Sequence, residues 1–226
     1  MSWVKAANLS TIGSVVHGFS DRRFKGDLEE AASYFGLERI FTLNQVHGSK
    51  VFVIKEELRE GSEHEGDAIV TGLKGIGIGV FTADCQPLLL VDRKASVAAA
   101  VHAGWMGTLS QITRATLVRM KESYGVDPSN ISAVLGPSIG KCCYEVDEDV
   151  ASLFKDKFED WDGFLSKRSS SKYVLDIKEA NKVALIREGV EDLEVIDVCT
   201  KCDSGFHSYR RDGKGVGKQL SLVGLV

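Results

Sequence analysis

The spacing of apolar residues along the chain predicts an alternation of strands and helices. Four short runs rich in aliphatic residues predict buried strands at 51–54, 75–81, 88–91 and 96–101. Apolar residues three to four positions apart predict helices at 108–123, from about 147 to 158, and from 177 onward. In the last of these, Asp176 and Glu179 have the spacing of a capping box. Further strands are predicted at 195–198 and starting at 206–209.

This alternation predicts the α/β fold class, as a layered α/β sandwich of mixed sheets flanked by helices. A chain of 226 residues is within the range of one large domain. The sequence has no internal repeat, no Pro-rich linker and only 3 prolines. We therefore expect one domain over residues 1–226.

The composition narrows the functional classes. Hydrophobic residues make up 43% and charged residues 27% of the chain, as in ordinary globular proteins. The net charge of −4 and the lack of a dense basic run argue against nucleic acid as a partner. The first residues lack the apolar core of a signal peptide, and no apolar run reaches membrane-spanning length. We expect a cytoplasmic protein, present as a monomer or weak homodimer.

Three separated residues have side chains suited to a metal. His47 lies in the phrase 44–48, Cys85 in 82–85 and His102 in 101–105. Two imidazoles and one thiolate can hold Zn²⁺ and leave the fourth position open, as in catalytic zinc sites. Taken singly, each histidine is more often a structural residue, and a free cysteine is more often a small buried hydrophobe. The hypothesis therefore depends on the fold to bring the three together.

The other four cysteines give weaker signals. Five cysteines are an odd count for a disulfide framework, and the expected compartment keeps thiols reduced. Cys142 and Cys143 are adjacent, which disfavours a disulfide between them. Cys199 and Cys202 form a C-x-x-C pair, but metal knuckles usually need a second such pair, and the chain has none. We interpret Cys199 and Cys202 as a structural or incidental pair.

Six phrases together carry a family resemblance. They are residues 44–48, 66–71, 82–88, 101–105, 136–146 and 208–211, read as NQVHG, GDAIVT, TADCQPL, VHAGW, GPSIGKCCYEV and SYRR. In this order they resemble the YfiH/YlmD family, long labelled laccase-like polyphenol oxidase and later purine nucleoside phosphorylase. The resemblance extends from about Val16 to the C-terminus, so it covers nearly the whole chain.

The resemblance implies a fold, a metal and an activity. The fold would be layered sheets and helices, similar in topology to some bacterial toxin cysteine hydrolases. The metal, usually zinc, would be held by His47, Cys85 and His102. The activities would be phosphorolysis of adenosine, inosine and methylthioadenosine, and deamination of adenosine, all in one pocket. The partners would then be purine nucleosides and phosphate.

Roles can be assigned to individual residues on this basis. Zinc with an open position lowers the pKa of bound water, which suits attack on C6 of adenosine. Cys85, His102 and Asp84 are the catalytic candidates. Asp84 could orient a histidine or accept a proton. An equal alternative is that Asp84 only forms a turn. For substrate and phosphate the candidates are Asn44, Arg22, Arg210 and Arg211, because a guanidinium offers a bidentate fork. Backbone N–H groups of the 136–140 loop could contribute.

One departure from the family bears on phosphate. The family typically has Gly-Trp-Arg-Gly where this chain has Met106 in place of Arg. A thioether cannot hydrogen-bond an anion, so we expect weaker phosphorolysis, or use of Arg22, Arg210 or Arg211 instead. Near the C-terminus, Lys218 replaces a usual Arg and keeps the charge.

Three alternatives remain open. A copper-dependent phenol oxidase would need many histidines, and the chain has 5, although Cu²⁺ could occupy the zinc site. A Cys-His hydrolase would use Cys85 as the nucleophile and His102 as the base. A metal-binding partner protein without turnover is the third.

Overall fold

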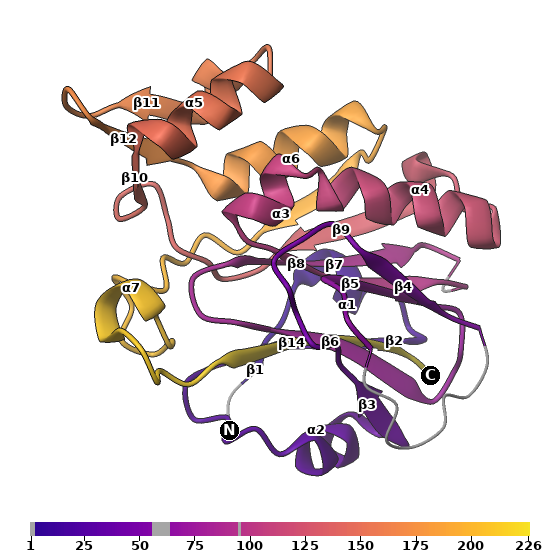
Figure 1. The fold of residues 1–226 in the computed structure, drawn as a ribbon. Coiled ribbons are helices and arrows are strands. Elements are labelled where there is room, and N and C mark those ends of the chain that lie inside the picture. The colour runs from indigo at the N-terminus through magenta and orange to yellow at the C-terminus, as the bar shows by residue number, and fades with distance from the viewer. Residues whose placement is uncertain (1–2, 56–63, 95) are drawn as a thin grey trace.

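Two stacked β-sheets with helices on both outer faces form the body of the molecule (Figure 1). The computed structural model describes residues 3–55, 64–94 and 96–226. This is the layered α/β arrangement that the alternating pattern predicts.

The first sheet has five strands in the order β1-β2-β14-β6-β3. Its neighbours are antiparallel, except that β3 runs parallel to β6. The central strand, β14, comes from the C-terminus and pairs with both β2 and β6, so the sheet joins the two ends of the chain. The strands are β1 (Trp3–Val4), β2 (Val15–Ser20), β14 (Gln219–Leu225), β6 (Ile76–Thr82) and β3 (Arg39–Phe41).

The second sheet has six strands in the order β13-β9-β7-β8-β5-β4. The four central strands are antiparallel, and an edge strand is added in parallel on each side. The strands are β13 (Asp192–Val195), β9 (Ile131–Leu135), β7 (Gln86–Asp92), β8 (Ala98–Ala103), β5 (Ala68–Thr71) and β4 (Val51–Ile54). A small antiparallel sheet stands apart, made of β10 (Glu145–Asp147), β12 (Lys172–Leu175) and β11 (Leu165–Lys167).

The helices are distributed over these layers. Helix α2 covers the outside of the first sheet, α4 and α6 cover the second, and α5 lies on the small sheet (Figure 1). The bounds are α1 (Ala7–Ser10), α2 (Leu28–Phe35), α3 (Trp105–Leu109), α4 (Ile112–Tyr124), α5 (Glu148–Lys157), α6 (Ile177–Arg187) and α7 (Tyr209–Asp212), with 3₁₀ turns η1 (Pro128–Asn130) and η2 (Trp161–Gly163).

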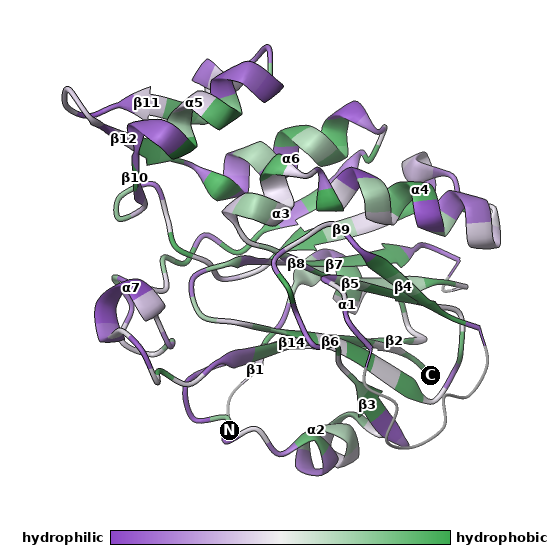
Figure 2. Cartoon of the chain, in the orientation of Figure 1, coloured by the Kyte–Doolittle hydropathy of each residue, from purple (hydrophilic) through white to green (hydrophobic). Residues whose placement is uncertain are grey.

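Strand β7 shows how the sequence builds two cores at once. Successive side chains of a strand point to opposite faces. Leu88 and Leu90 therefore pack under α4 and α6, whereas Leu89 and Val91 pack between the two sheets. All four are fully buried, which explains a continuous apolar run rather than an alternating one. Figure 2 shows the result as hydrophobic strands inside and hydrophilic outer faces on the helices.

Most of the predicted elements are confirmed. The strands predicted at 51–54, 75–81, 88–91 and 96–101 correspond to β4, β6, β7 and β8. The helix predicted from about 147 is α5, and Asp176 caps α6 by accepting from the Glu179 N–H at 3.0 Å. The strand predicted at 195–198 overlaps β13 only at its first residue.

Three details of the prediction are wrong. The predicted helix at 108–123 is two helices, because Gln111 adopts a left-handed conformation with φ 60° between α3 and α4. The capping box is only half formed, since the Asp176 N–H donates to the Phe164 carbonyl and Glu179 pairs with Lys182. Residues 206–209 do not start the last strand. Ser208 caps the short helix α7 instead, by accepting from the Arg211 N–H.

No helix in the described ranges combines the length and the apolar character needed to cross a membrane. The longest of them, α4, has 13 residues.

His17 is a buried histidine with a structural role. Its side chain is 2% exposed on β2, and Nε2 accepts a hydrogen bond from the Ala6 N–H at 2.9 Å. Burial, followed by the charge of Lys5, lowers the pKa of His17 from 6.5 to about 4. Between pH 6.5 and about 4, His17 therefore stays neutral in the folded protein, whereas the same side chain is protonated in the unfolded chain.

This predicts an acid-dependent loss of stability. As the pH falls from 6.5 toward 4, His17 binds a proton in the unfolded chain but not in the folded protein. The free energy of unfolding should fall by at most about 1.4 kcal/mol per pH unit from this group. His17→Gln keeps an acceptor for Ala6 but cannot titrate, so urea unfolding should show a shallower decline over this window. Equal slopes for the variant and the parent protein would contradict the prediction.

Candidate metal centre and substrate cavity

The fold brings His47, Cys85 and His102 together. One ligand-type atom from each lies within 4.8 Å of the others, and the two imidazole rings meet edge to face with centroids 4.7 Å apart. His47 is in the segment after β3, Cys85 in the turn between β6 and β7, and His102 in β8. The convergence on which the sequence hypothesis depends is therefore present.

Strand register accounts for part of this convergence. β7 and β8 are antiparallel, with Pro87 opposite His102 and Gln86 opposite Ala103. Cys85, which immediately precedes β7, is thereby placed at the end of β8 where His102 lies. His47 reaches the same point with a backbone φ of 60°, a conformation uncommon outside glycine.

Asp67 holds the two histidines in position. Its buried carboxylate contacts Nδ1 of His102 at 2.8 Å and accepts from the backbone N–H groups of His47 and Gly48 at 2.9 and 2.7 Å. Its carbonyl also accepts from the His102 N–H at 2.7 Å. With Nδ1 engaged by Asp67, Nε2 of His102 is the nitrogen left for a metal, an arrangement common among histidine ligands.

The electrostatics of the cluster favour charged forms. Burial alone would raise the pKa of Cys85, but hydrogen bonding and the nearby charges of His102 and His47 lower it to about 7. Burial alone would lower the pKa of His102, but Asp67 and Cys85 raise it to about 9. A thiol that readily becomes a thiolate is the form that binds metal.

The residues present fit a metal ion with an open position. A Cβ on Gly104 would lie 3.1 Å from Sγ of Cys85 and 3.3 Å from Cδ2 of His47, so glycine leaves the ligands their space. Within the described ranges, the cluster contains three ligand-type side chains and no fourth. Imidazole nitrogen and thiolate sulfur are zinc ligands, and three protein ligands with an open fourth position are the arrangement of catalytic zinc sites.

A cavity of about 690 Å³ opens onto this centre. Its walls are largely apolar and aromatic, and polar groups stand among them. The apolar lining includes Leu43, Phe81, Trp105, Met106, Ile139, Tyr144, Ile177 and Val216, and the polar lining includes Asn44, Gln45, Asp84, Arg210 and Lys218. Convergent polar groups in a mostly apolar cavity are typical of a small-molecule site.

Asp84 anchors the chain beside the cavity. Its carboxylate accepts from Thr200 Oγ1 at 2.7 Å, Ser208 Oγ at 3.1 Å and the Arg210 N–H at 2.6 Å. Of the two roles considered for Asp84, the structure shows the turn-forming one, and the contact to a histidine is made by Asp67. With a φ of 86°, Asp84 also forms the turn that precedes Cys85.

The predicted phosphate candidates are not all in one place. Arg210 lines the cavity, with its guanidinium 5.3 Å from the Tyr144 ring and one donor on the Glu145 carbonyl. Arg22 lines a neighbouring pocket of about 450 Å³ that shares Phe81 and Lys218 with the cavity.

Arg211 is turned toward the protein. Its guanidinium donates to four backbone carbonyls between Thr200 and Phe206 and pairs with Asp212. Arg211 is not among the residues that line the cavity, and its contacts hold the 200–206 turn in shape.

Sequence reasoning gave no role to Asp67. It lies in the 66–71 phrase, and the signal was an acid directly before the apolar run 68–70, where a buried carboxylate needs partners. Tyr144 and Lys218 were likewise quoted without a role in substrate binding.

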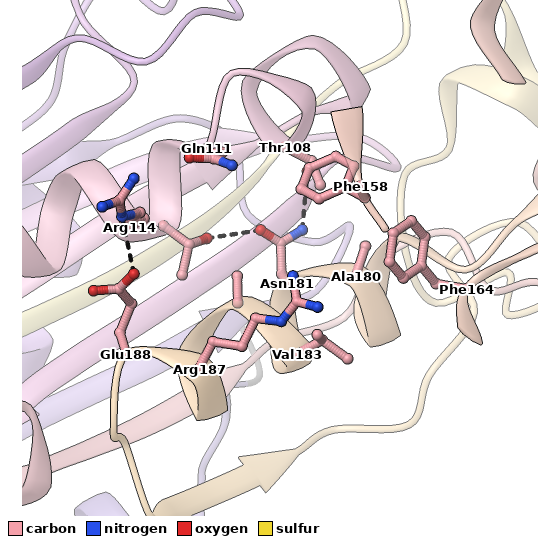
Figure 3. Close-up of a pocket in the computed structure, with 12 residues that line it drawn as sticks. Thr108, Gln111, Arg114, Phe158, Phe164, Ala180, Asn181, Val183, Arg187 and Glu188 are labelled. Carbon is pink, nitrogen blue, oxygen red and sulfur yellow. Dashed lines mark hydrogen bonds and ion pairs between the residues drawn. The ribbon is translucent and has the colours of Figure 1, made fainter. Parts of the chain in front are cut away.

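A second pocket, of about 190 Å³, lies between α4 and α6, away from the metal ligands (Figure 3). Several of its polar side chains pair with one another. Asn181 bonds to Thr113 at 2.7 Å and Thr108 at 2.9 Å, and Arg114 pairs with Glu188 at 2.9 Å. We assign this pocket no chemistry.

The chain is similar to a matched family model and to several known proteins. The family model for multi-copper polyphenol oxidoreductase laccase matches residues 20–226. A purine nucleoside phosphorylase of Deinococcus radiodurans is 38% identical over 196 residues, covering 86% of this chain and 74% of that protein. Adenosine deaminase RL5, from an unknown prokaryotic organism, is 35% identical over 198 residues, covering 83% of this chain and 75% of that protein.

Solved structures share the fold. YlmD from Geobacillus stearothermophilus superposes with a TM-score of 0.89 at 26% identity, covering 100% of this chain and 96% of that one. YfiH from Bacillus licheniformis gives a TM-score of 0.85 at 24% identity, covering 94% of this chain and 93% of that one. The fold, the order of its motifs and the matched family model lead to one conclusion: the chain belongs to the YfiH/YlmD family of laccase-like proteins.

Proposed function

We propose that this protein is a zinc-dependent purine nucleoside phosphorylase that also deaminates adenosine. The observation that carries the proposal is the cluster of His47, Cys85 and His102 at the wall of a cavity large enough for a nucleoside. The names of the relatives, purine nucleoside phosphorylase and adenosine deaminase, support the same reaction classes.

The cavity walls suit a nucleoside. Tyr144 and Trp105 offer aromatic surface for a purine, since flat bases pack well on rings. Asn44 and Gln45 supply polar atoms to the same cavity, although Gln45 bonds to the Phe81 backbone through both its amide groups. Asn44 is therefore the better candidate for contact with a sugar or base.

Arg210 and Lys218 are the cations that line the cavity, and we assign phosphate to them. In phosphorolysis, a phosphate oxygen forms the new bond to C1′ as the bond to the purine nitrogen breaks, and the electron pair leaves with the purine. Cationic donors position the anion and offset its charge. In deamination, water adds to C6 and ammonia leaves. When bound, zinc supplies Lewis-acid activation of water or of a substrate group.

A thiol hydrolase is the second candidate, favoured by one specific observation. Cys85, His102 and Asp67 form a chain of contacts like that of a Cys-His-Asp catalytic triad. A multi-copper oxidase fits less well. Within the described ranges, His17, His64 and His207 lie outside every cluster that could hold a metal, whereas blue and trinuclear copper sites need many histidines.

The deciding assay supplies adenosine with and without phosphate and resolves the products by chromatography. We expect inosine without phosphate, and adenine or hypoxanthine only when phosphate is present. Cys85→Ala should abolish all three products, because it removes a metal ligand. Products no greater than those of Cys85→Ala would contradict the proposal. Activity that survives chelation but is lost on alkylation of Cys85 would favour the thiol hydrolase.

Asp67→Asn tests the positioning of the histidines. Asn has one acceptor oxygen where Asp67 uses two, so it cannot serve His102, His47 and Gly48 together. Affinity of the catalytic centre for zinc, measured by competition with a chelator, should fall about 10- to 100-fold. Asp127→Asn, at an exposed cap of η1, is the matched control and should bind zinc as the parent does. Unchanged zinc affinity in Asp67→Asn would show that its role is structural only.

Met106→Arg tests the effect of the family departure on phosphate. Met106 lines the cavity at the start of α3 and is 41% exposed, so a longer cation can be accommodated. One added charge-assisted contact should lower KM for phosphate about tenfold and leave deamination unchanged. Met106→Gln is the uncharged control of similar length. If the two variants have equal KM for phosphate, the phosphate does not approach this position.

A further inference from the structure

Four cysteines gather in a second cluster outside the catalytic centre. Their sulfur atoms all lie within 4.8 Å of one another, and Sγ of Cys202 is 3.7 Å from Cys142 and 3.3 Å from Cys143. All four are free thiols, two of them exposed and two half-buried: Cys142, Cys143, Cys199 and Cys202. Ions in solution can therefore reach them.

Two segments far apart in the sequence supply the four thiols. Cys142 and Cys143 end the loop that follows β9, and Cys199 and Cys202 belong to the turn that follows β13. β9 and β13 are parallel neighbours, so their carboxyl ends lie at the same edge of the sheet. An isolated bridge of Ser138 with Cys199 continues the pairing to the cluster.

Local hydrogen bonds shape both segments around the sulfurs. The Cys143 N–H donates to the Gly140 carbonyl at 2.9 Å, and the Cys202 N–H donates to the Cys199 carbonyl at 3.1 Å. The Gly140 N–H donates to Sγ of Cys199 at 3.2 Å. A Cβ on Gly140 would lie only 3.3 Å from Sγ of Cys142, so glycine keeps room for the cluster.

The spacing suits a single tetrahedral ion. Zinc binds thiolates at about 2.3 Å, which places sulfur atoms about 3.8 Å apart at the corners of a tetrahedron. The separations of 3.7 and 3.3 Å are close to that edge length. The Gly140 N–H that donates to Sγ of Cys199 offsets part of the negative charge of the thiolates.

We propose that Cys142, Cys143, Cys199 and Cys202 bind a second, structural zinc ion. Four Zn–S bonds form, and the protons of the thiols pass to water, so no oxidant is needed. C-x-x-C is a usual half of such a site, and the adjacent pair Cys142 and Cys143 supplies the other half.

Other fates of the thiols fit less well. A disulfide requires sulfurs about 2.0 Å apart and would need an oxidant. In an iron–sulfur cluster the thiolates bind different irons joined by sulfide, so they stand farther apart than around one ion. A single ion satisfies all four thiols at once.

This ion would secure the wall of the substrate cavity. Ile139 and Tyr144, on either side of the first segment, line the cavity, and so does Arg210, which follows the second. Joining the two segments through four bonds would hold these side chains at fixed separations. The role is structural, because every position of the tetrahedron is filled by protein.

Metal analysis of zinc-loaded protein tests this proposal without reference to turnover. The parent protein should hold about two zinc ions per chain, and Cys85→Ala about one. In the Cys85→Ala background, the double substitution Cys199→Ser and Cys202→Ser should leave none. Ser204→Ala, at an exposed neighbour in the same turn, is the matched control and should retain the ion. Cobalt in place of zinc in Cys85→Ala should give the intense absorption of a four-thiolate site.

Thiol reactivity provides a measurement that needs no further cysteine variant. In zinc-loaded Cys85→Ala, the four thiols should resist alkylation and become reactive after a strong chelator is added. A Cys85→Ala protein without zinc, with iron in its place, or with its thiols paired as disulfides overturns the proposal. Zinc that persists in the serine double variant overturns it as well. Because these readouts use a variant without the catalytic ligand, they are independent of the proposed nucleoside chemistry.

Discussion

The contacts of the buried Asp67 carboxylate are the interactions on which the cluster of His47, Cys85 and His102 depends. Burial alone would raise the pKa of Asp67, but hydrogen bonds from His102, Gly48 and His47 lower it. A buried carboxylate without such partners would be strongly destabilising. The three donors therefore stabilise the charge, and in return the charge fixes one histidine ring and the backbone of the other. The same contacts thus stabilise the fold and position the candidate metal ligands.

Strand pairing within the six-stranded sheet explains the position of this carboxylate. Asp67 immediately precedes β5, and β5 pairs with β8 so that Ala68 lies opposite Val101. Because the two strands are antiparallel, Asp67, one residue before Ala68, lies opposite His102, one residue after Val101. Only the turn into β7 is needed to add Cys85. A central antiparallel sheet with fully buried strands makes these positions rigid.

What could be predicted from the sequence follows from local physics. Strands β4, β6, β7 and β8 were visible because burial selects runs of aliphatic residues. The helix break at Gln111 was not, because a left-handed conformation in a polar residue leaves no compositional mark. The strand expected at 206–209 failed because Ser208 caps a helix there. Pairing of β2 with β14, some 200 residues apart, has no local signal at all.

In the candidate site, too, some residues had a local sequence signal and others did not. Local phrases marked the three candidate metal ligands, but only the tertiary pairing decides which acid contacts which group. Asp84, adjacent to Cys85, was the natural choice by proximity in sequence. In the fold its carboxylate holds Thr200, its carbonyl accepts from the Ile139 N–H at 2.9 Å, and both partners lie on the segments that carry the four-cysteine cluster. Asp84 therefore connects the turn that presents Cys85 to both cysteine segments, so a shift in either segment would reach Cys85 through a single residue.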